Sequence, residues 1–274
     1  MPRTLGEALA LLAEGGGVWR PFAGGTDLMV LLEAGRLAQR KFFSVWNLEE
    51  LRGVSVEDDR VSLGALVTYS EVRESEVLRR EFPSLVSAAR ETGGWAIQNR
   101  GTLGGNIANA SPAADSPPAL LAYGARLELV SSAGARTVDY ADFHTGYKQT
   151  VMRDDELIAR IVLPRPAPGA HHFYRKVGTR RAQAISKVCL AGLVETEGGE
   201  VREVRLAIGS VAPTVVRCRR AEGALRGRRL EPSLVAEACE ELAADITPID
   251  DIRSTARYRS RVARNLLRDF LQSL

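Results

Sequence analysis

Cysteine and histidine are scarce in this chain of 274 residues, which contains only three of each. Cys189, Cys218 and Cys239 lie far apart, and no pair has the C-x-x-C spacing typical of iron–sulfur and zinc ligands. An iron–sulfur cluster or a zinc site built by this chain alone is therefore not expected. Three thiols without a disulfide framework also indicate a reducing compartment.

The three histidines do not indicate a metal site either. His144 is isolated, and His171 and His172 are neighbours, whose side chains would point to opposite faces of a strand. We interpret the stretch around these neighbours as a linker. No arrangement of serine, histidine and aspartate indicates nucleophilic catalysis, so the sequence predicts neither a catalytic side chain nor a metal ligand.

Long apolar runs and a strong charge of one sign are also missing. No run approaches the roughly 20 apolar residues that a membrane helix needs, and the N-terminal residues have neither a long apolar core nor a twin arginine. A net charge of +3, with scattered arginines, is too small to indicate a nucleic-acid-binding protein. We therefore expect a cytoplasmic protein with no membrane span and no nucleic-acid partner.

Two glycine-rich stretches stand out from this composition. The first is residues 20–28 (RPFAGGTDL), and the second is residues 100–108 (RGTLGGNIA). Glycine lets another group approach the backbone, and successive free N–H groups form a concave anion site. Neither stretch matches the P-loop or the G-x-G-x-x-G pattern. We interpret them as two loops that fold against each other around one phosphate-bearing cofactor, although each loop alone fits a plain turn equally well.

Apolar periodicity predicts both helices and strands. Thr4 and Glu7 match a capping box at the start of the first helix. The further helices that we predict are, by residue range, 27–34, 68–92 with an interruption at Pro83, 119–123, 233–244 and 252–272. The strands that we predict are 18–23, 42–46, 156–163, 186–195 and 201–208, with hairpins at 54–63 and 126–139.

A domain boundary is predicted at residues 164–171, which contain three prolines and a glycine. The last predicted helix carries one apolar stripe, whose residues recur at steps of four and indicate packing. This stripe consists of Tyr258, Val262, Leu266 and Phe270.

The order of these motifs resembles the FAD-binding (medium) subunit of the molybdenum hydroxylases. That family includes carbon monoxide dehydrogenase and bacterial xanthine dehydrogenase. The resemblance covers nearly the whole chain. In chain order it is carried by AGGTD (23–27), TLGGNIA (102–108), SPAAD (111–115), YRKVG (174–178), IGSVAPT (208–214), Arg217, Glu222 and YRSRVA (258–263).

The resemblance implies an α+β fold of the two-glycine-loop (PCMH-like) FAD-binding type, made of two subdomains. A C-terminal three-stranded sheet with a helical bundle follows. The implied FAD-binding domain is residues 1–165, divided into subdomains 1–52 and 53–165. The implied C-terminal flavoprotein domain is residues 172–274.

FAD is the implied cofactor, and the two loops are implied to wrap its pyrophosphate and the adjacent sugar. In the first loop the implied contacts are Arg20, Pro21, Phe22, Ala23, Gly24, Gly25, Thr26, Asp27 and Leu28. In the second loop they are Gly101, Thr102, Gly104, Gly105, Asn106, Ile107 and Ala108. Thr92, Gly93, Asp115, Ile158 and Lys176 complete the implied site.

Asp115 and Lys176 each allow a second interpretation. Asp115 matches the family aspartate expected to accept hydrogen bonds from cofactor hydroxyls, but it also stands where the next helix would take an N-cap. Lys176 matches a basic residue near the flavin ring, where a cation would stabilise the anionic reduced flavin. It also fits an ordinary surface lysine.

The implied function is that of an FAD-carrying electron-transfer subunit of an oxidoreductase. In the family, substrate is hydroxylated at a molybdenum cofactor on a large subunit, and electrons reach the FAD through two [2Fe–2S] clusters on a small subunit. A dimer of heterotrimers is the implied assembly. Two alternatives stay open: a free-standing FAD oxidoreductase of the same fold, and an interaction scaffold that has lost FAD.

Overall fold

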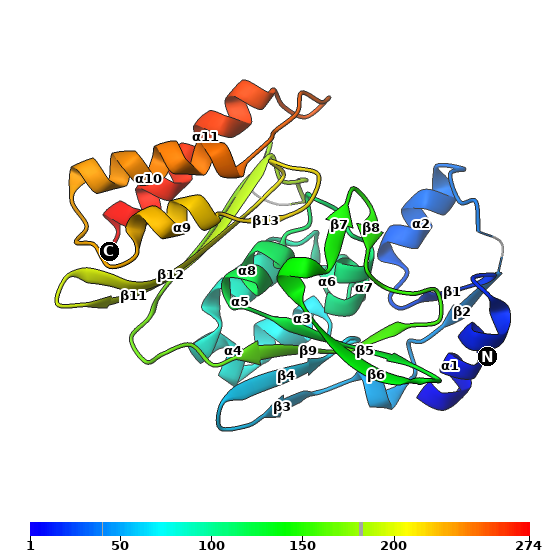
Figure 1. Ribbon diagram of the computed structural model, residues 1–274. Helices are drawn as coiled ribbons and strands as arrows, with labels where there is room; N and C mark the ends of the chain where they lie inside the picture. The colour runs from blue at the N-terminus through cyan, green and yellow to red at the C-terminus, as the bar shows by residue number, and fades with distance from the viewer. Residues whose placement is uncertain (40, 181–182) are drawn as a thin grey trace.

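The computed structural model describes residues 1–39, 41–180 and 183–274. Figure 1 shows three units along the molecule. An N-terminal unit (blue) lies at one end, a central unit (cyan to green) lies in the middle, and a C-terminal unit (yellow to red) lies at the other end. No helix in these described ranges is long and apolar enough to cross a membrane.

The N-terminal unit begins with helix α1 (Leu5–Gly15), capped by Thr4, whose hydroxyl accepts a hydrogen bond from the Glu7 N–H at 3.2 Å. The predicted capping box forms only in part, because the Glu7 carboxylate accepts from the N–H of Arg3 instead. Strands β1 (Trp19–Phe22) and β2 (Lys41–Ser44) pair in parallel. Helix α2 (Thr26–Glu33) follows β1 and buries no residue. The unit ends in a 3₁₀ turn, η1 (Glu49–Leu51).

The central unit is built on a five-stranded antiparallel sheet in the order β3-β4-β9-β5-β6. Both predicted hairpins are present, as β3–β4 and β5–β6. The strands are β3 (Val54–Val56), β4 (Arg60–Gly64), β5 (Arg126–Ser131), β6 (Gly134–Asp139) and β9 (Leu157–Pro164). Between β6 and β9 lie a 3₁₀ turn, η2 (Tyr140–Asp142), and a small hairpin, β7 (His144–Gly146) with β8 (Gln149–Thr150).

Short helices cover this sheet. They are α3 (Tyr69–Glu74), α4 (Glu76–Glu81), α5 (Pro83–Glu91), α6 (Trp95–Gln98), α7 (Leu103–Ala108) and α8 (Ser116–Ala122). Pro83 takes the first position of α5, where its missing N–H costs nothing. The prediction of a single interruption at Pro83 is incomplete, because Ser75 ends α3 and also caps α4.

The C-terminal unit has a four-stranded antiparallel sheet in the order β10-β11-β12-β13. Three of its strands are long, β10 (His171–Val177), β11 (Val188–Glu197) and β12 (Glu200–Gly209), and β13 (Val216–Arg217) adds two residues at the edge. Helices α9 (Arg219–Leu225), α10 (Pro232–Asp245) and α11 (Ala256–Gln272) follow. His171 and His172 begin β10, so their placement in a linker was wrong.

This sheet is covered on both faces. Ala191, Leu193 and Ala207 pack into the core of the central unit, whereas Leu190 and Leu206 pack into a second core with α9, α10 and α11. Alternate side chains of one strand therefore serve two cores, which explains the apolar runs of β11 and β12. Helices α5 and α8 lie between the two sheets (Figure 1). The C-terminal sheet consequently packs on α5 and α8 of the central unit.

The predicted apolar stripe of α11 is present in most of its length. Leu266 and Phe270 are buried and Val262 packs against the same core. Tyr258 does not join them, because its side chain is 41% exposed. In the first turn of α11, Tyr258 therefore faces outward, while its neighbour Arg259 is 3% exposed.

Candidate functional site

The two glycine loops meet in the structure. A Cβ atom placed on Gly24 would lie 1.7 Å from the carbonyl oxygen of Arg100 and 2.5 Å from its carbonyl carbon. No side chain fits at such a distance, so only glycine lets residue 24 rest against the second loop. The prediction that residues 20–28 and 100–108 fold against each other is confirmed.

The first loop runs from strand β1 through a tight turn into helix α2. Arg20, Pro21 and Phe22 belong to the strand, Ala23 and Gly24 form the bend, and Thr26, Asp27 and Leu28 form the first helical turn. Gly25 is the N-cap of α2 and has φ +75°. This left-handed conformation is readily adopted by glycine and strained for most other residues.

The first loop leaves a row of backbone donors free. Within the described chain, the N–H groups of Gly25, Thr26, Asp27 and Leu28 make no hydrogen bond. The first N–H groups of a helix have no partner inside that helix, and the helix dipole places partial positive charge there. Such a set of donors can bind a phosphate or diphosphate.

In the second loop, most backbone N–H groups donate hydrogen bonds to other atoms of the chain. The N–H groups of Leu103 and Gly104 donate to the carbonyl oxygens of Val67 and Ala65, both at 2.9 Å. Gly105 donates to the Thr102 hydroxyl at 3.1 Å, which caps α7. The second loop is therefore held firmly against the central unit, and most of its donors are not available to a ligand.

The glycines of the second loop serve packing between chain segments. A Cβ atom on Gly104 would lie 2.6 Å from the Ala65 Cβ and 2.7 Å from its carbonyl oxygen. A Cβ atom on Gly101 would lie 2.8 Å from the ring of Tyr69. Gly104 is buried and Gly105 is exposed. Close packing against Ala65 thus requires glycine at position 104, whether or not a phosphate binds nearby.

A stack of three side chains joins the second loop to the N-terminal unit. The guanidinium of Arg100 lies 3.9 Å from the ring centroid of Trp46, and that of Arg52 lies 4.9 Å from the same centroid. Cation–π contacts of this kind hold Arg100 in place. Its carbonyl oxygen is therefore held against Gly24. Sequence analysis missed this stack, and the only available signal was the presence of Trp46 at the end of a predicted strand.

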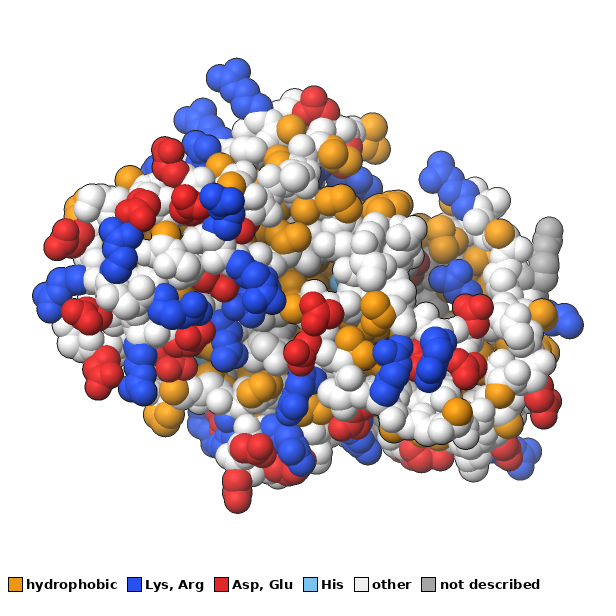
Figure 2. Space-filling view, viewed as in Figure 1, with side chains coloured by type: hydrophobic (Ala, Val, Ile, Leu, Met, Phe, Trp, Pro, Cys, Tyr) orange, Lys and Arg blue, Asp and Glu red, His pale blue; other side chains and the backbone are white. Residues whose placement is uncertain are grey.

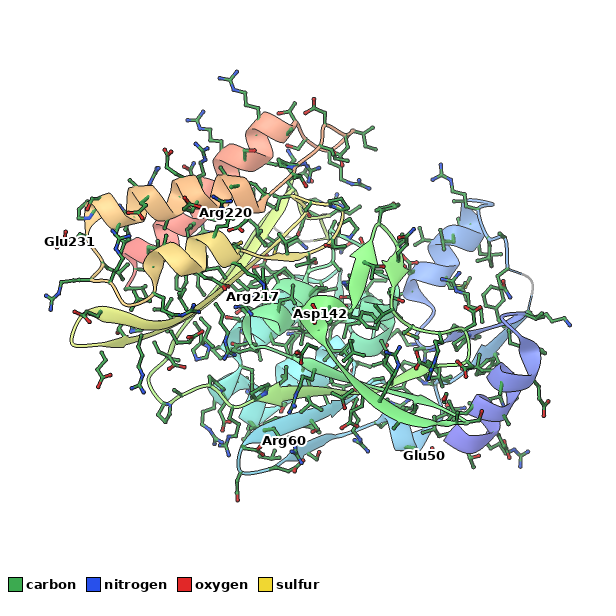
Figure 3. The ribbon with its side chains drawn as sticks, in the orientation of Figure 1. Glu50, Arg60, Asp142, Arg217, Arg220 and Glu231 are labelled. Atoms are coloured by element: carbon green, nitrogen blue, oxygen red, sulfur yellow. The ribbon has the colours of Figure 1, made fainter. Side chains whose placement is uncertain are left out.

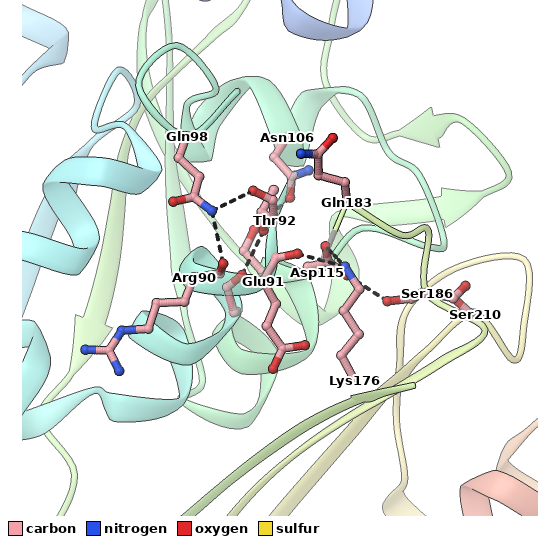
Figure 4. Close-up of polar contacts among 12 residues, drawn as sticks. Arg90, Glu91, Thr92, Gln98, Asn106, Asp115, Lys176, Gln183, Ser186 and Ser210 are labelled. Atoms are coloured by element: carbon pink, nitrogen blue, oxygen red, sulfur yellow. Dashed lines mark hydrogen bonds and ion pairs between the residues drawn. The ribbon is translucent and has the colours of Figure 1, made fainter. Parts of the chain in front are cut away.

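A buried ion pair lies near the second loop, where Ser116, the neighbour of Asp115, donates to the Asn106 Oδ1 at 2.7 Å (Figure 4). The Lys176 Nζ lies 2.6 Å from the Asp115 Oδ2 and donates to the Glu91 carbonyl oxygen at 2.9 Å. The Ser186 hydroxyl donates to the Asp115 Oδ1 at 2.7 Å. The side chains of Lys176 and Asp115 are only 5% and 10% exposed. Lys176 is therefore not a surface lysine.

Asp115 occupies the N-cap position of α8, but its side chain makes no capping hydrogen bond. The carboxylate turns instead to Lys176 and Ser186, so the capping interpretation is wrong. Burial raises the pKa of the Asp115 carboxyl, and Lys176, Ser186 and Thr92 act in the opposite direction. Burial likewise raises the pKa of Glu91, against the effect of Lys176. Because a buried charge is stable only when it is paired, these partners depend on each other.

Thr92 and Gly93 lie at the end of α5, beside this ion pair. Gln98, which is 4% exposed, donates from its side chain to the carbonyl oxygens of Arg90 and Thr92 at 3.0 and 3.1 Å (Figure 4). Gly93 has φ +57° and turns the chain toward α6. Gln98 thus fixes the turn that carries two predicted site residues. Sequence analysis missed Gln98 and Ser186, because a single glutamine or serine gives no pattern.

Ile107 and Ile158 are placed differently from the other predicted residues. Their side chains are 0% and 5% exposed and pack in the core of the central unit. The carbonyl oxygen of Ile107 lies 2.9 Å from the Nε2 of His144. The exposed part of α7 consists of Gly105 and Ala108, with Asn106 partly exposed. Any contact of Ile107 with a ligand in this arrangement would use its backbone.

The β7–β8 hairpin brings a cation to the first loop. Lys148 lies in the turn of this hairpin with φ +57°, and its Nζ donates to the Asn109 Oδ1 at 2.6 Å. Burial lowers the pKa of Lys148, Asp27 opposes this effect and Arg20 adds to it. Lys148 therefore lies within electrostatic range of both first-loop residues. Sequence analysis missed it, because a lysine in a two-residue turn resembles a solvated loop residue.

These features fit a cofactor that carries a diphosphate. Free backbone donors and the cations Arg20 and Lys148 lie at one side, and a paired lysine and carboxylate lie below. Figure 2 shows a hollow in the molecular surface between the end that carries α2 and the rest of the molecule. No group of three or more metal-ligating side chains is placed to hold a metal ion in the described part of the chain.

Two family patterns match the chain. Residues 1–166 match the family described as the FAD binding domain in molybdopterin dehydrogenase, and residues 172–274 match the CO dehydrogenase flavoprotein C-terminal domain. Together they cover most of the sequence in the expected order.

Individual relatives are similar over nearly the full length. The xanthine dehydrogenase FAD-binding subunit of Escherichia coli O157:H7 is 33% identical over 261 residues, which cover 93% of this chain and 88% of that protein. The glyceraldehyde dehydrogenase medium chain of Sulfolobus acidocaldarius is 32% identical over 263 residues, with coverages of 96% and 92%.

The fold is also that of a solved relative. The structure of carbon monoxide dehydrogenase from Hydrogenophaga pseudoflava which lacks the Mo-pyranopterin moiety contains a chain with 29% identity and a TM-score of 0.96, and the match covers 99% of this chain and 94% of that one. The resemblance inferred from the motifs is thereby confirmed, with FAD as the cofactor. The chain belongs to the family of FAD-binding medium subunits of the molybdenum hydroxylases, and it is a subunit of an oxidoreductase.

Proposed function

We propose that this chain carries electrons between partner subunits and a terminal acceptor. When bound, FAD supplies the redox chemistry, taking electrons from [2Fe–2S] clusters on a small partner and passing them on. The proposed partners are that small subunit and a large molybdenum-cofactor subunit, assembled as a dimer of heterotrimers. Among the described residues three free cysteines are present, all buried, so this chain offers no cluster ligands of its own.

The free donors of the first loop are the observation that carries this proposal. The N–H groups of residues 25–28 have no partner in the described chain and lie where the two loops meet. We propose that they bind the diphosphate, with the Lys148 ammonium in support. Gly24 holds the two loops together, and the second loop serves as the fixed wall of the site.

The remaining predicted site residues position the cofactor in this proposal. The Asp115 carboxylate accepts hydrogen bonds, and the Lys176 Nζ lies against it. Because the charges of this pair largely cancel, Lys176 contributes a directed N–H donor more than a net positive field. The division into domains at 1–165 and 172–274 belongs to the same proposal.

The test is FAD loading of the purified chain. We expect the protein, alone or in its complex, to show the visible absorption of oxidised flavin after incubation with FAD and removal of the excess. A Gly24→Leu variant should come out colourless, because a large side chain forces the loops apart. Wild-type protein that stays colourless after FAD addition would contradict the proposal. Heat-released FAD identified by chromatography distinguishes FAD from FMN.

A further inference from the structure

Helix α11 carries a row of exposed arginines. Arg257, Arg261, Arg264 and Arg268 are spaced by four, three and four residues, so they lie on one face of the helix. All four are exposed. They line an open groove of about 500 Å³ together with Ser260 and Asn265. In Figure 2, Lys or Arg side chains project from the edge of the molecule over the C-terminal helices.

These arginines have no acidic partner within the described chain, since none of the four takes part in an ion pair. The neighbouring helices differ. Arg220 of α9 pairs with Glu241 of α10 at 2.9 Å, and Arg228 pairs with Glu237 at 2.7 Å. Arg217, labelled with Arg220 in Figure 3, pairs with Glu222 at 2.7 Å. Several arginines of the C-terminal unit are thus neutralised by nearby carboxylates, whereas this row of four is not.

The row costs the helix stability. Like charges three or four residues apart on a helix repel each other and destabilise it. The opposite face of α11 is buried through Leu266, Leu267 and Phe270, so the helix cannot rotate to separate the charges. Dissolved salt screens this repulsion, and an acidic partner surface would relieve it at a defined place.

Exposed apolar side chains occur in the first turn of α11 and in the segment that precedes it. Ile249 is 68% exposed, Ile252 is 99% exposed and Tyr258 is 41% exposed. Arginine together with aromatic side chains is enriched in protein–protein interfaces. Phosphate backbones bind arginine but gain nothing from exposed isoleucine. The mixture therefore favours a protein surface over a nucleic acid.

We propose that this surface, the α11 patch, docks an acidic surface of a partner subunit in the same complex. The α11 patch comprises Ile249, Ile252, Arg257, Tyr258, Arg261, Arg264 and Arg268. It lies in the C-terminal unit, at the other end of the molecule from α1 and α2 (Figure 1). The inference rests on the proposed function, because the subunit that would dock on the patch belongs to the proposed multi-subunit assembly.

The experiment reverses two central charges of the patch. The Arg261→Glu/Arg264→Glu variant and the wild type are loaded with FAD, and their affinity for the co-purified partner subunits is measured by analytical ultracentrifugation at low and high salt. We expect affinity to fall at least about tenfold, and its salt dependence to weaken, because charge pairs across the interface are lost. An Arg261→Lys/Arg264→Lys variant should keep most of the affinity, since it keeps the charge.

A matched control separates the patch from net charge. Arg126 and Arg219 are exposed and form no ion pair within the described chain, so Arg126→Glu/Arg219→Glu changes the charge equally at other places. Unchanged affinity in the patch variant, or an equal loss in this control, would overturn the proposal. The proposal would also be overturned if the wild type bound duplex DNA or acidic vesicles and the patch variant lost this binding but kept its affinity for the partner subunits.

The FAD content of the same samples keeps the two proposals apart. If the wild type holds no FAD, the proposed function fails whatever the subunit affinity. If all variants hold FAD equally and charge reversal leaves subunit affinity unchanged, only the proposal for the α11 patch fails. A variant that loses FAD together with affinity is misfolded. The salt dependence of the wild-type affinity then carries the test, and a wild-type affinity that does not change with salt overturns the proposal.

Discussion

The two glycine loops look alike in sequence and differ in structure. Each contains a Gly-Gly pair followed by a polar residue, and each is part of or next to a short helix: the first pair precedes α2, and the second lies inside α7. The N–H groups of residues 25–28 in the first loop have no partner within the described chain. In the second loop those of Gly101, Leu103, Gly104 and Gly105 all donate to atoms of the chain. The first loop therefore offers donors to a ligand, and the second loop offers a fixed support.

This difference shows that a glycine-rich loop is not by itself a phosphate site. Glycine at 24 and at 104 is required because other backbone segments lie too close for a side chain. Glycine at 25 is favoured by its positive φ. None of these reasons involves a ligand directly. What indicates a ligand is the set of unpaired donors, which only the first loop has in quantity.

The largest effect is expected for Gly24→Ala. Its new Cβ would lie 1.7 Å from the Arg100 carbonyl oxygen, so the loops must separate. We expect FAD affinity to fall by about 100-fold or more and the free energy of unfolding to fall by about 3 kcal/mol. Fluorescence titration and urea unfolding measure the two quantities. Gly223→Ala is the matched control, because nothing lies within 4 Å of its Cβ position; an equal response in both variants would refute the packing explanation.

Gly104→Ala should act mainly on folding. The Cβ would meet Ala65 at 2.6 Å in a buried position, which costs about 1–3 kcal/mol of unfolding free energy. We expect FAD affinity per folded molecule to change much less than in Gly24→Ala, since Gly104 already donates its N–H to Ala65. Urea unfolding with and without FAD measures both. A variant with wild-type stability but no FAD binding would show that the second loop contacts the diphosphate directly.

Amide hydrogen exchange tests the comparison without a mutation. The N–H groups of residues 25–28 should exchange rapidly in the cofactor-free protein and at least about tenfold more slowly after FAD addition. Those of Leu103, Gly104 and Gly105 should be protected in both states, because they already donate within the chain. Protection gained only in the second loop would reverse the assignment of the two loops.

A smaller difference in stability is expected between variants of the two threonines, Thr102 in the second loop and Thr26 in the first. Thr102→Val removes the cap from the Gly105 N–H and should cost about 1 kcal/mol of unfolding free energy. Thr102→Ser keeps the hydroxyl and should restore most of it. The Thr26 side chain makes no hydrogen bond within the described chain, so Thr26→Val should leave stability nearly unchanged. Equal losses at both positions, measured by urea unfolding of the cofactor-free protein, would contradict the difference between the loops.

The smallest expected effect is a dependence of stability on pH, caused by a histidine that contacts the end of the second loop. Burial lowers the pKa of His144 below its ordinary value of 6.5, and its Nε2 lies 2.9 Å from the Ile107 carbonyl oxygen. The folded state disfavours protonation of the His144 imidazole. The stability that the neutral imidazole contributes is therefore present above pH 6.5 and is lost as the pH falls below it. A His144→Gln variant should show a weaker loss of melting temperature on acidification. His172, whose pKa is also lowered by burial, remains in both proteins as a shared background.

Much of the fold was predictable because its signals are local. Thr4 caps α1, the hairpins β3–β4 and β5–β6 follow alternating apolar residues, and the strands β11 and β12 follow continuous apolar runs. The errors have local causes too. Ser75 ends one helix and starts the next, a role that serine also plays in loops. His171 and His172 begin a strand directly after a proline-rich segment.

The sequence led to a set of predicted site residues but gave no information on the contacts between them. The resemblance named Asp115 and Lys176 as site residues, but their ion pair joins residues 61 positions apart. Ser186 and Gln98 gave no signal at all, since each acts through one or two hydrogen bonds to distant partners. Ile107 and Ile158 remain predicted site residues, although the structure buries their side chains in the core.

The sequence by itself determined where the chain can turn tightly, which segments are helical or extended, and, through the order of its motifs, the family. Tertiary structure alone decided which backbone donors stay free. The carbonyl oxygens of Ala65 and Val67 accept from the N–H groups of Gly104 and Leu103 in the second loop, while no described segment accepts from those of residues 25–28. The physical reason is that a hydrogen bond depends on the position of both partners, and the second partner here lies more than thirty residues away along the chain.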